Sequence, residues 1–274
     1  MRVPSLLGAV AIAALIVGMP FCAARSADMA VKAPSAAANW TGWYIGGNFG
    51  YALGSSDSTT STTFIPGLYL PPTSVAAINA AGAQQLTPNA FTGGVQTGAN
   101  TQVANYVVGI EFDFELLGAN QAASTSQIYP CAGTTCPAGS TFSVGSQVKA
   151  DWLTTVRPRV GYAFDNVLVY ATAGLAVTDI RANFGFTDSL GVAEAASISR
   201  VKAGWAAGAG FDCRIAGGWS ARFEYLYADF GGVATSASLS VPPAVGGITP
   251  SNPFSHSADL NFSIVRAGLN YKLF

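Results

Sequence analysis

Charged side chains are scarce in this chain. Lysine, arginine, aspartate and glutamate make up 10% of its 274 residues, whereas a water-soluble domain usually carries about 25%. A surface facing water on all sides is therefore not expected. The net charge of −1 also lacks the basic excess with which proteins bind nucleic acid, so we expect no nucleic-acid partner.

Long apolar runs are missing after the N-terminus. Residues 28–274 contain no stretch of about 18 uninterrupted apolar residues, which a membrane-spanning helix needs. Residues 1–27 combine Arg2, the apolar core Leu6–Val17 and small residues, a pattern typical of a secretory signal peptide. Only helices and closed barrels satisfy backbone hydrogen bonds in lipid, so a membrane protein of this composition has to be a barrel.

Histidine is nearly absent as well. The one histidine, His256, lies between Ser255 and Ser257, and neighbours in a strand point to opposite faces rather than forming a nucleophile–base pair. We expect it to be a solvated loop residue. The sequence therefore predicts no catalytic residue, no metal site and no cofactor.

The four cysteines do not form one framework. Cys22 lies in the predicted signal peptide, and Cys131 and Cys136 flank four loop residues. In an oxidising compartment a disulfide between these two is favoured. A metal site is the weaker alternative, because no histidine or carboxylate lies beside them. Cys213 is most simply a small apolar residue of a strand.

The remaining pattern is a regular beat of eight stretches in which apolar and other residues alternate, as in β-strands. Their connectors are long and short in turn, which places every long connector on one side of a membrane and both chain ends on the other. The sequence thus predicts an all-β fold, an eight-stranded antiparallel up-and-down transmembrane β-barrel, over residues 40–274, entered through a periplasmic leader at residues 28–39. The long connectors are Ser55–Pro88, Ala119–Gln147, Asp179–Ser199 and Gly232–Ser257, and the short ones centre on Thr101–Ala104, Phe164–Asn166 and Ile215–Gly218.

Alternation alone does not tell which face meets water, since a soluble lipocalin-type barrel has the same period with the faces exchanged. Here the non-apolar face is mostly Gly, Ser, Thr, Asn and Ala, too poor in charge for a water-facing surface. Aromatic residues such as Trp40, Trp43 and Tyr271 lie near the ends of the stretches, as interfacial girdles do. We therefore expect the apolar face to contact lipid.

The inward face then collects acidic and basic residues in nearly equal numbers. Because a buried unpaired charge is costly, they should form a salt-bridged network in a plugged or very narrow lumen. The alternative is a selective ion path. The predicted members are Glu111, Asp113, Glu115, Asp151, Arg157, Arg159, Lys202, Asp212, Arg222, Glu224 and Arg266.

The opening strand, Asn-Trp-Thr-Gly-Trp-Tyr-Ile-Gly-Gly-Asn, resembles that of the small outer-membrane immunogenic proteins, the porin-like surface antigens of Gram-negative bacteria. The resemblance implies an outer-membrane location and recognition of Tyr271 and Phe274 by the barrel-assembly machinery. Two departures are Pro158, which a central strand tolerates badly and which predicts a bulge or a lost hydrogen bond, and Leu273 inserted before the last residue. The matching segments are Asn39–Asn48, Tyr106–Glu111, Trp152–Ala163, Tyr170–Ala176, Phe223–Tyr227 and Arg266–Tyr271.

Together these features predict a structural surface protein and antigen, not an enzyme, that supports envelope integrity and contacts outer-membrane lipid and lipopolysaccharide. One alternative is a narrow diffusion porin for small solutes. The other is capture of a ligand or a host surface by the external loops.

Overall fold

The computed structural model describes residues 39–130, 137–242 and 251–274. Three features predicted from the sequence fall outside these residues and stay predictions: the signal peptide at 1–27, the leader at 28–39 except for its last residue, and the disulfide between Cys131 and Cys136.

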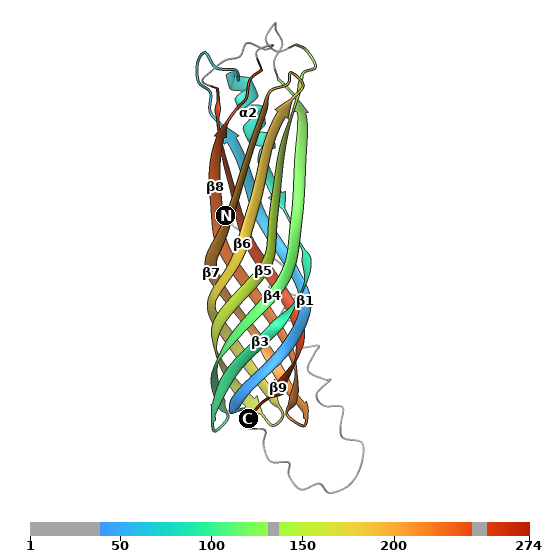
Figure 1. The fold of residues 1–274 in the computed structure, drawn as a ribbon, viewed down its shortest axis with the longest axis vertical. Helices are drawn as coiled ribbons and strands as arrows, with labels where there is room; N and C mark the ends of the chain where they lie inside the picture. Colours follow the sequence, from blue (N-terminus) through green and yellow to red (C-terminus); the bar gives the residue numbers. More distant parts are fainter. Residues whose placement is uncertain (1–38, 131–136, 243–250) are drawn as a thin grey trace.

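Eight long strands form a closed antiparallel ring, which confirms the predicted fold (Figure 1). Each pairs with the next along the chain, and β1 pairs with β9 from Tyr44↔Lys272 to Thr62↔Phe254. The short strand β2 (Ala83–Leu86) pairs with β1 beyond the end of β3, and follows the helix α2 (Pro72–Ala81). The eight strands are β1 (Gly42–Thr62), β3 (Ala90–Val103), β4 (Tyr106–Ile128), β5 (Thr141–Phe164), β6 (Val167–Asp188), β7 (Ala193–Ala216), β8 (Trp219–Ser238) and β9 (Pro253–Lys272).

Three tight turns close one end of the ring. They lie at Ala104–Asn105, Asp165–Asn166 and Gly217–Gly218, where the short connectors were predicted. Ala104 and Asp165 have φ values of 52° and 47°, a left-handed conformation that suits two-residue hairpin turns. The C-terminus lies at the same end (Figure 1), so this end faces the periplasm.

The predicted long connectors are mostly strand, which corrects the expectation of four long external loops. β1 continues to Thr62, β4 to Ile128 and β6 to Asp188, and all three remain paired with their neighbours. The sheet therefore rises well past the apolar band. We call this upper part the extracellular extension; it comprises residues 52–62, 117–128, 141–151, 178–188, 193–204, 228–238 and 253–264.

The two faces of the sheet exchange character between the lower part and the extension. Below, Phe49 and Val95 face outward and are 71% and 58% exposed. Above, the outward residues are small and polar, as at Ser255 and Ser257, whereas Phe254 faces inward and is fully buried. The lower part thus presents an apolar surface to lipid, and the extension presents a polar one.

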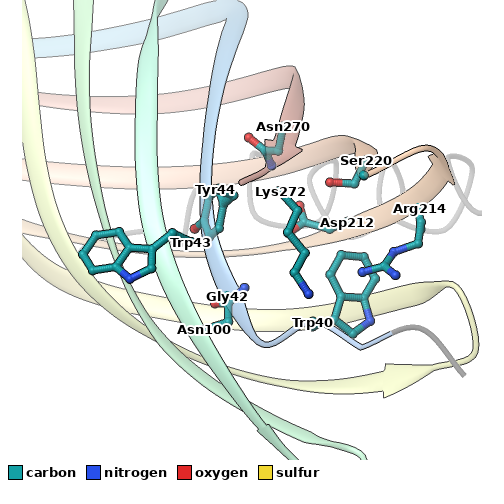
Figure 2. A pocket seen from close by; sticks show the side chains of 11 residues that line it. Trp40, Gly42, Trp43, Tyr44, Asn100, Asp212, Arg214, Ser220, Asn270 and Lys272 are labelled. Atoms are coloured by element: carbon teal, nitrogen blue, oxygen red, sulfur yellow. The ribbon is translucent and has the colours of Figure 1, made fainter. Parts of the chain in front are cut away.

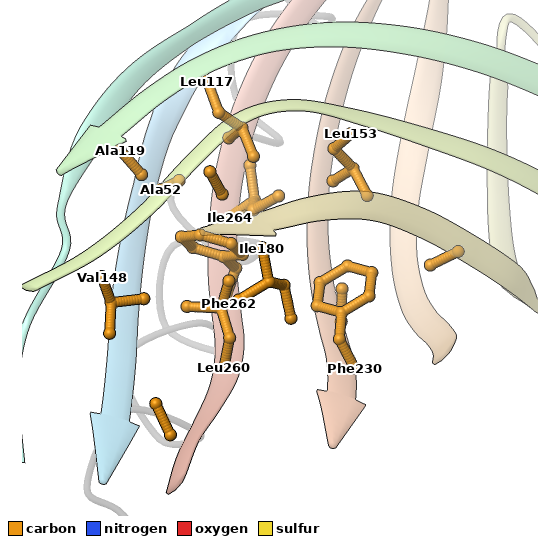
Figure 3. Packing of buried hydrophobic residues seen from close by; sticks show 14 of the residues in the cluster. Ala52, Leu117, Ala119, Val148, Leu153, Ile180, Phe230, Leu260, Phe262 and Ile264 are labelled. Carbon is orange, nitrogen blue, oxygen red and sulfur yellow. The ribbon is translucent and has the colours of Figure 1, made fainter. Parts of the chain in front are cut away.

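An apolar layer fills the interior where the extension begins. Side chains from β4, β5, β6, β8 and β9 meet there (Figure 3), among them Leu117, Leu153, Ile180, Phe230 and Phe262, each at most 3% exposed. The layer excludes water from the middle of the lumen.

Helix α2 covers the extracellular mouth of the barrel, at the end opposite the C-terminus (Figure 1). Pro72 lies in its first turn, where a missing N–H costs nothing, and Val75 and Ile78 are its buried face. They pack on Phe142 and Phe186 of the sheet. No helix among the described residues is long and apolar enough to cross a membrane.

Pro158 interrupts the ladder between β5 and β6, as predicted. The paired residues run to Val156↔Leu175 and resume at Arg159↔Thr172 in the same register. The outcome is therefore lost backbone pairing and not a bulge at this position. The Thr172 hydroxyl donates to the Pro158 carbonyl at 2.9 Å, which replaces one of the missing hydrogen bonds.

Candidate functional site

Nine charged side chains meet in one buried network that crosses the lower lumen. Each is at most 3% exposed. The five carboxylates are Glu111, Asp113 and Glu115 on β4, Asp212 on β7 and Glu224 on β8, and the four guanidinium groups are Arg157 and Arg159 on β5, Arg222 on β8 and Arg266 on β9.

Arg157 ties β5 to β4. Its Nη2 atom lies 3.0 Å from Glu111 Oε1 and 2.7 Å from Asp113 Oδ2. Its Nε atom donates to the Thr155 hydroxyl at 2.9 Å. These charge-assisted bonds hold one guanidinium against two carboxylates of the neighbouring strand.

Arg266 joins the opposite side of the ring to the same carboxylates. Its Nη2 atom lies 3.2 Å from Asp113 Oδ2. The guanidinium also bonds Glu115 and Glu224. Asp113 on β4 is thus shared across the lumen by an arginine of β5 and an arginine of β9.

Asp212 organises the periplasmic side of the network. Arg222 donates from Nε to Asp212 Oδ1 at 2.7 Å and from Nη2 to Oδ2 at 3.1 Å, a bidentate pair. Arg159 Nη2 lies 2.9 Å from Asp212 Oδ2. Arg222 also bonds Glu111, so Glu111 links this side to the rest of the network.

Two tyrosines also belong to the network, although neither was among the predicted site residues. Tyr44 donates to Glu111 at 2.5 Å and Tyr170 donates to Glu224 at 3.0 Å. The Arg159 guanidinium lies 4.4 Å from the Tyr170 ring centroid. The alternation along the strands could have identified both tyrosines as interior residues, since each lies next to an apolar residue that faces outward.

Amides close the space beside the charges. Asn48 donates to Gln96 at 3.0 Å, and Gln96 donates to Asn270 at 2.6 Å. An eight-stranded barrel is just wide enough for side chains to fill it. Over residues 39–130, 137–242 and 251–274, no group of three His, Cys, Asp or Glu side chains is placed to hold a metal ion.

Asp151 does not belong to the network, contrary to its predicted place. Its side chain is 49% exposed and lies 2.8 Å from Arg181 on the outer face. The β5–β6 register shifts between Lys149 and Leu153. Such an irregularity moves all residues beyond it to the other face, and Asp151 lies inside it.

Lys202 is also outside the network. It lies on β7 opposite Thr178, level with the extension and not with the nine charges. Its side chain is half-buried and forms no ion pair with any described residue. The prediction correctly placed Lys202 among the inward-facing positions of β7. It was wrong about the level along the barrel axis, because Lys202 lies above the nine charges.

Residues just before β1 fold across the periplasmic mouth (Figure 2). Arg214 stacks 5.2 Å from the Trp40 ring centroid and donates to the Asn39 carbonyl at 2.7 Å. Lys272 donates to the same carbonyl at 3.1 Å. Trp40 is only 7% exposed, so it closes the barrel end and is not part of a lipid-facing girdle. The remaining cavity there, about 20 Å³, has room for about one water.

The profile of the family described as outer membrane protein beta-barrel domain matches residues 14–272. The chain belongs to this family. It is 34% identical over 270 residues to the 31 kDa outer-membrane immunogenic protein of Brucella melitensis biotype 1, covering 95% of this chain and 98% of that protein. It is 26% identical over 194 residues to a 22 kDa outer membrane protein of Rhizobium leguminosarum bv. viciae, covering 71% and 66%. Among solved structures it is similar to OprG from Pseudomonas aeruginosa, with 15% identity, a TM-score of 0.46 and coverage of 86% and 97%.

The chain is therefore an outer-membrane β-barrel protein, and its similarity to immunogenic relatives identifies it as a structural surface protein, as the sequence predicts. The family consists mainly of proteins without enzymatic activity. The two residues of the predicted insertion signal lie apart. Tyr271 is on the outer face of β9 and lies against Trp219, with tilted rings whose centroids are 5.0 Å apart. Phe274 lies beyond the end of β9 and is 76% exposed.

His256 is a buried strand residue of this barrel and not the solvated loop residue expected. It is 2% exposed on β9. Its Nε2 atom lies 3.0 Å from Glu194 Oε1, and its Nδ1 atom lies 3.0 Å from the Thr60 hydroxyl. The serines on either side face outward, so the pairing in space is with distant strands.

Cys213 was expected to be a small apolar residue of a strand. It is a buried residue of β7, which agrees with that expectation. It is the one cysteine among the described residues.

Asp188 holds the segment that leads into α2 through hydrogen bonds, and we call this group of hydrogen bonds the clasp. Tyr69 and Tyr129 both donate to its Oδ2 atom, at 2.7 and 3.2 Å. Its Oδ1 atom accepts the backbone N–H groups of Leu190 and Val192, each at 2.9 Å. Burial raises the pKa of each of the two phenols above the ordinary value for tyrosine, and the nearby Asp188 carboxylate raises it further.

We expect this clasp to open in alkali. A raised folded-state pKa means that the phenol contributes its full stability below pH of about 10, the pKa of an unperturbed tyrosine, and loses it as the pH rises further. Cleavage of residues 63–71 by an alkaline serine protease should accelerate above that pH. In the double variant Tyr69→Phe/Tyr129→Phe, which cannot ionise, cleavage should be faster at neutral pH and gain little more in alkali. An equal alkaline acceleration in both proteins would contradict the assignment.

Proposed function

We propose that this chain is a non-conducting structural barrel that supports the integrity of the outer membrane and displays a polar extension on the cell surface. The network of nine charges carries the proposal. It runs from β4 through β5, β7 and β8 to β9 across the lumen, and each guanidinium group bonds carboxylates. A pore needs a continuous water path, which these buried and paired charges interrupt.

Two further barriers support the proposal. The apolar layer around Ile180 and Phe262 lies above the charges, and α2 covers the mouth above that layer. An ion would have to cross a charged, an apolar and a helical layer in turn. This stacking disfavours the alternative of a narrow diffusion porin, and no contact of the described residues favours the alternative of ligand capture.

We also propose that the barrel has no catalytic activity. Thr60, His256 and Glu194 form a chain of hydrogen bonds that could suggest a hydrolytic triad. All three side chains are at most 5% exposed inside the extension, so a substrate has no direct access to a nucleophile there. These hydrogen bonds are accounted for by a structural role, in which they satisfy buried polar groups inside the barrel.

Insertion into the membrane is the step at which a partner is required. We propose that the barrel-assembly machinery recognises the end of β9, where Tyr271 faces lipid and Phe274 is exposed. Lipid and lipopolysaccharide then contact the apolar band and the extension above it.

Planar-bilayer recordings test the closed lumen. Purified wild-type protein should insert without stable conductance steps, because no water path crosses the three layers. Insertion is verified by reconstituting the same preparation in liposomes and recording the mobility difference between boiled and unboiled samples on a gel. Reproducible steps from folded wild-type protein would overturn the proposal.

A further inference from the structure

The wall of the barrel parts between β7 and β8 in the extension. The two strands pair from Ala216↔Trp219 up to Trp205↔Asp229, and above that point only the bridge Ala193↔Ser240 joins them. Their other edges stay paired, β7 with β6 and β8 with β9. We call this unpaired stretch the seam; it lies between residues 194–204 of β7 and residues 230–238 of β8.

A local feature of β8 explains where the seam begins. The β8–β9 register shifts between Asp229 and Gly232. Gly231 has a φ of +62°, a left-handed conformation in which glycine is favoured. Its N–H donates to Asp229 Oδ1 at 2.8 Å. Such a bulge bends and twists its strand, and the pairing of β8 with β7 stops at this height.

Two basic residues on β7 lie along the seam. Arg200 and Lys202 are opposite Ile180 and Thr178, which face inward and are fully buried. Nevertheless Arg200 is exposed and Lys202 is half-buried. In a closed wall both charges would enter the apolar layer, at a high cost in free energy. The lost pairing between β7 and β8 at this height accounts for their exposure.

Neither basic residue has an acidic partner among the described residues. Two carboxylates that pair in register with neighbouring residues of β7, Asp179 with Val201 and Asp229 with Trp205, bond other groups. Asp179 is paired with Arg181 at 2.9 Å, and Asp229 accepts the Gly231 N–H. The seam therefore presents two positive charges that the protein leaves uncompensated.

The height of the seam matches the edge of the bilayer. Val201 is 66% exposed and Trp205 is 51% exposed, and above them the outward residues of β7 are small or polar. Trp205 lies against Tyr227 with ring centroids 5.5 Å apart, an aromatic pair typical of the membrane interface. Arg200 and Lys202 are thus placed at the level of the outer-leaflet headgroups.

We propose that Arg200 and Lys202 bind a phosphate group of a phosphorylated glycolipid in the outer leaflet. Arginine offers a planar fork for phosphate oxygens and lysine a compact second charge. The site lies beside the seam, where two inward-phase cations are exposed or half-buried at the level of the apolar layer. It deepens the proposed function, because a structural outer-membrane protein would thereby anchor itself to its own leaflet.

The test is binding of diphosphoryl lipid A to the full mature chain, folded in a non-ionic detergent. The controls are the same lipid with its phosphates removed and inorganic phosphate alone. The double variant Arg200→Gln/Lys202→Gln should bind diphosphoryl lipid A about 30-fold more weakly, since each cation near an anionic headgroup contributes about 1 kcal/mol. Each single variant should lose about fivefold by the same reasoning.

The variant Arg181→Gln is the matched control, because it removes a basic residue of similar height that already has carboxylate partners. It should bind as the wild type does. Unchanged binding by the double variant, or an equal loss in Arg181→Gln, would overturn the site. Inorganic phosphate binding as tightly as the lipid would overturn the lipid as its ligand. Each variant is scored as folded protein by its gel mobility. Conductance is recorded separately, so failure of this site and failure of the closed lumen are distinguishable.

Discussion

Replacing Arg157 by methionine should lower the free energy of unfolding by about 3–5 kcal/mol, the range for breaking a buried charge pair from one side. Arg157 is fully buried and bonds Glu111 and Asp113 at 3.0 and 2.7 Å. Methionine retains much of the volume but leaves these carboxylates without one of their cations. The unfolding midpoint in urea, followed by gel mobility in detergent, measures the loss.

The control is Arg181→Met. Arg181 also bonds two carboxylates, Asp151 at 2.8 Å and Asp179 at 2.9 Å, but it is half exposed on the outer face. Ion pairs in contact with water contribute about 0–1 kcal/mol. A similar loss in both variants would show that burial of the network does not determine its contribution.

Replacing Gly174 by alanine should destabilise the barrel by about 3 kcal/mol, the upper part of the usual range for overpacking. An added Cβ atom would lie 2.2 Å from the Val156 carbonyl oxygen and 2.8 Å from Arg157 Cα. Both are backbone atoms, which cannot rotate away. The strand would have to shift, and Arg157 with it, so the charged layer would be disturbed as well.

Gly185→Ala on the same strand is the matched control. The nearest atom to its added Cβ would be the Glu194 carbonyl oxygen at 3.8 Å, an ordinary contact. Its stability should stay within about 1 kcal/mol of the wild type, because alanine also restricts the unfolded chain. Equal losses of stability in the two glycine variants would refute the steric explanation. They would show that a Gly→Ala change destabilises β6 wherever it is made.

Period-two alternation was enough to predict which residues share a face in the lower barrel. Ile110 and Phe112 face outward, and Glu111 and Asp113 between them face inward. Nine of the eleven predicted interior charges lie together for this reason. The partners of each charge were not predictable, since they come from strands far apart in the sequence, as Arg266 and Asp113 do.

The extension escaped prediction because its alternation is weak and reversed. Serine, threonine and alanine face outward there, and Phe142 and Phe186 face inward. A period of two residues is expected whether the apolar residues face outward, as in the lower barrel, or inward, as in the extension. The alternation by itself therefore does not show whether the outer face contacts lipid or water. His256 was misjudged for this reason, because it falls in the predicted long connector Gly232–Ser257.

The amino-acid sequence by itself determined the strands, the phase of each lower strand, the closed ring and the inward charges, because local alternation encodes all of them. Only the tertiary structure decided where that phase breaks. The irregularity between Lys149 and Leu153 put Asp151 outside, and the pairing of β7 with β8 stops beside the bulge at Gly231, at the height of Lys202. One extra residue in a strand depends on pairing with its neighbours and leaves no mark in the pattern of residues, yet it redirects every side chain beyond it.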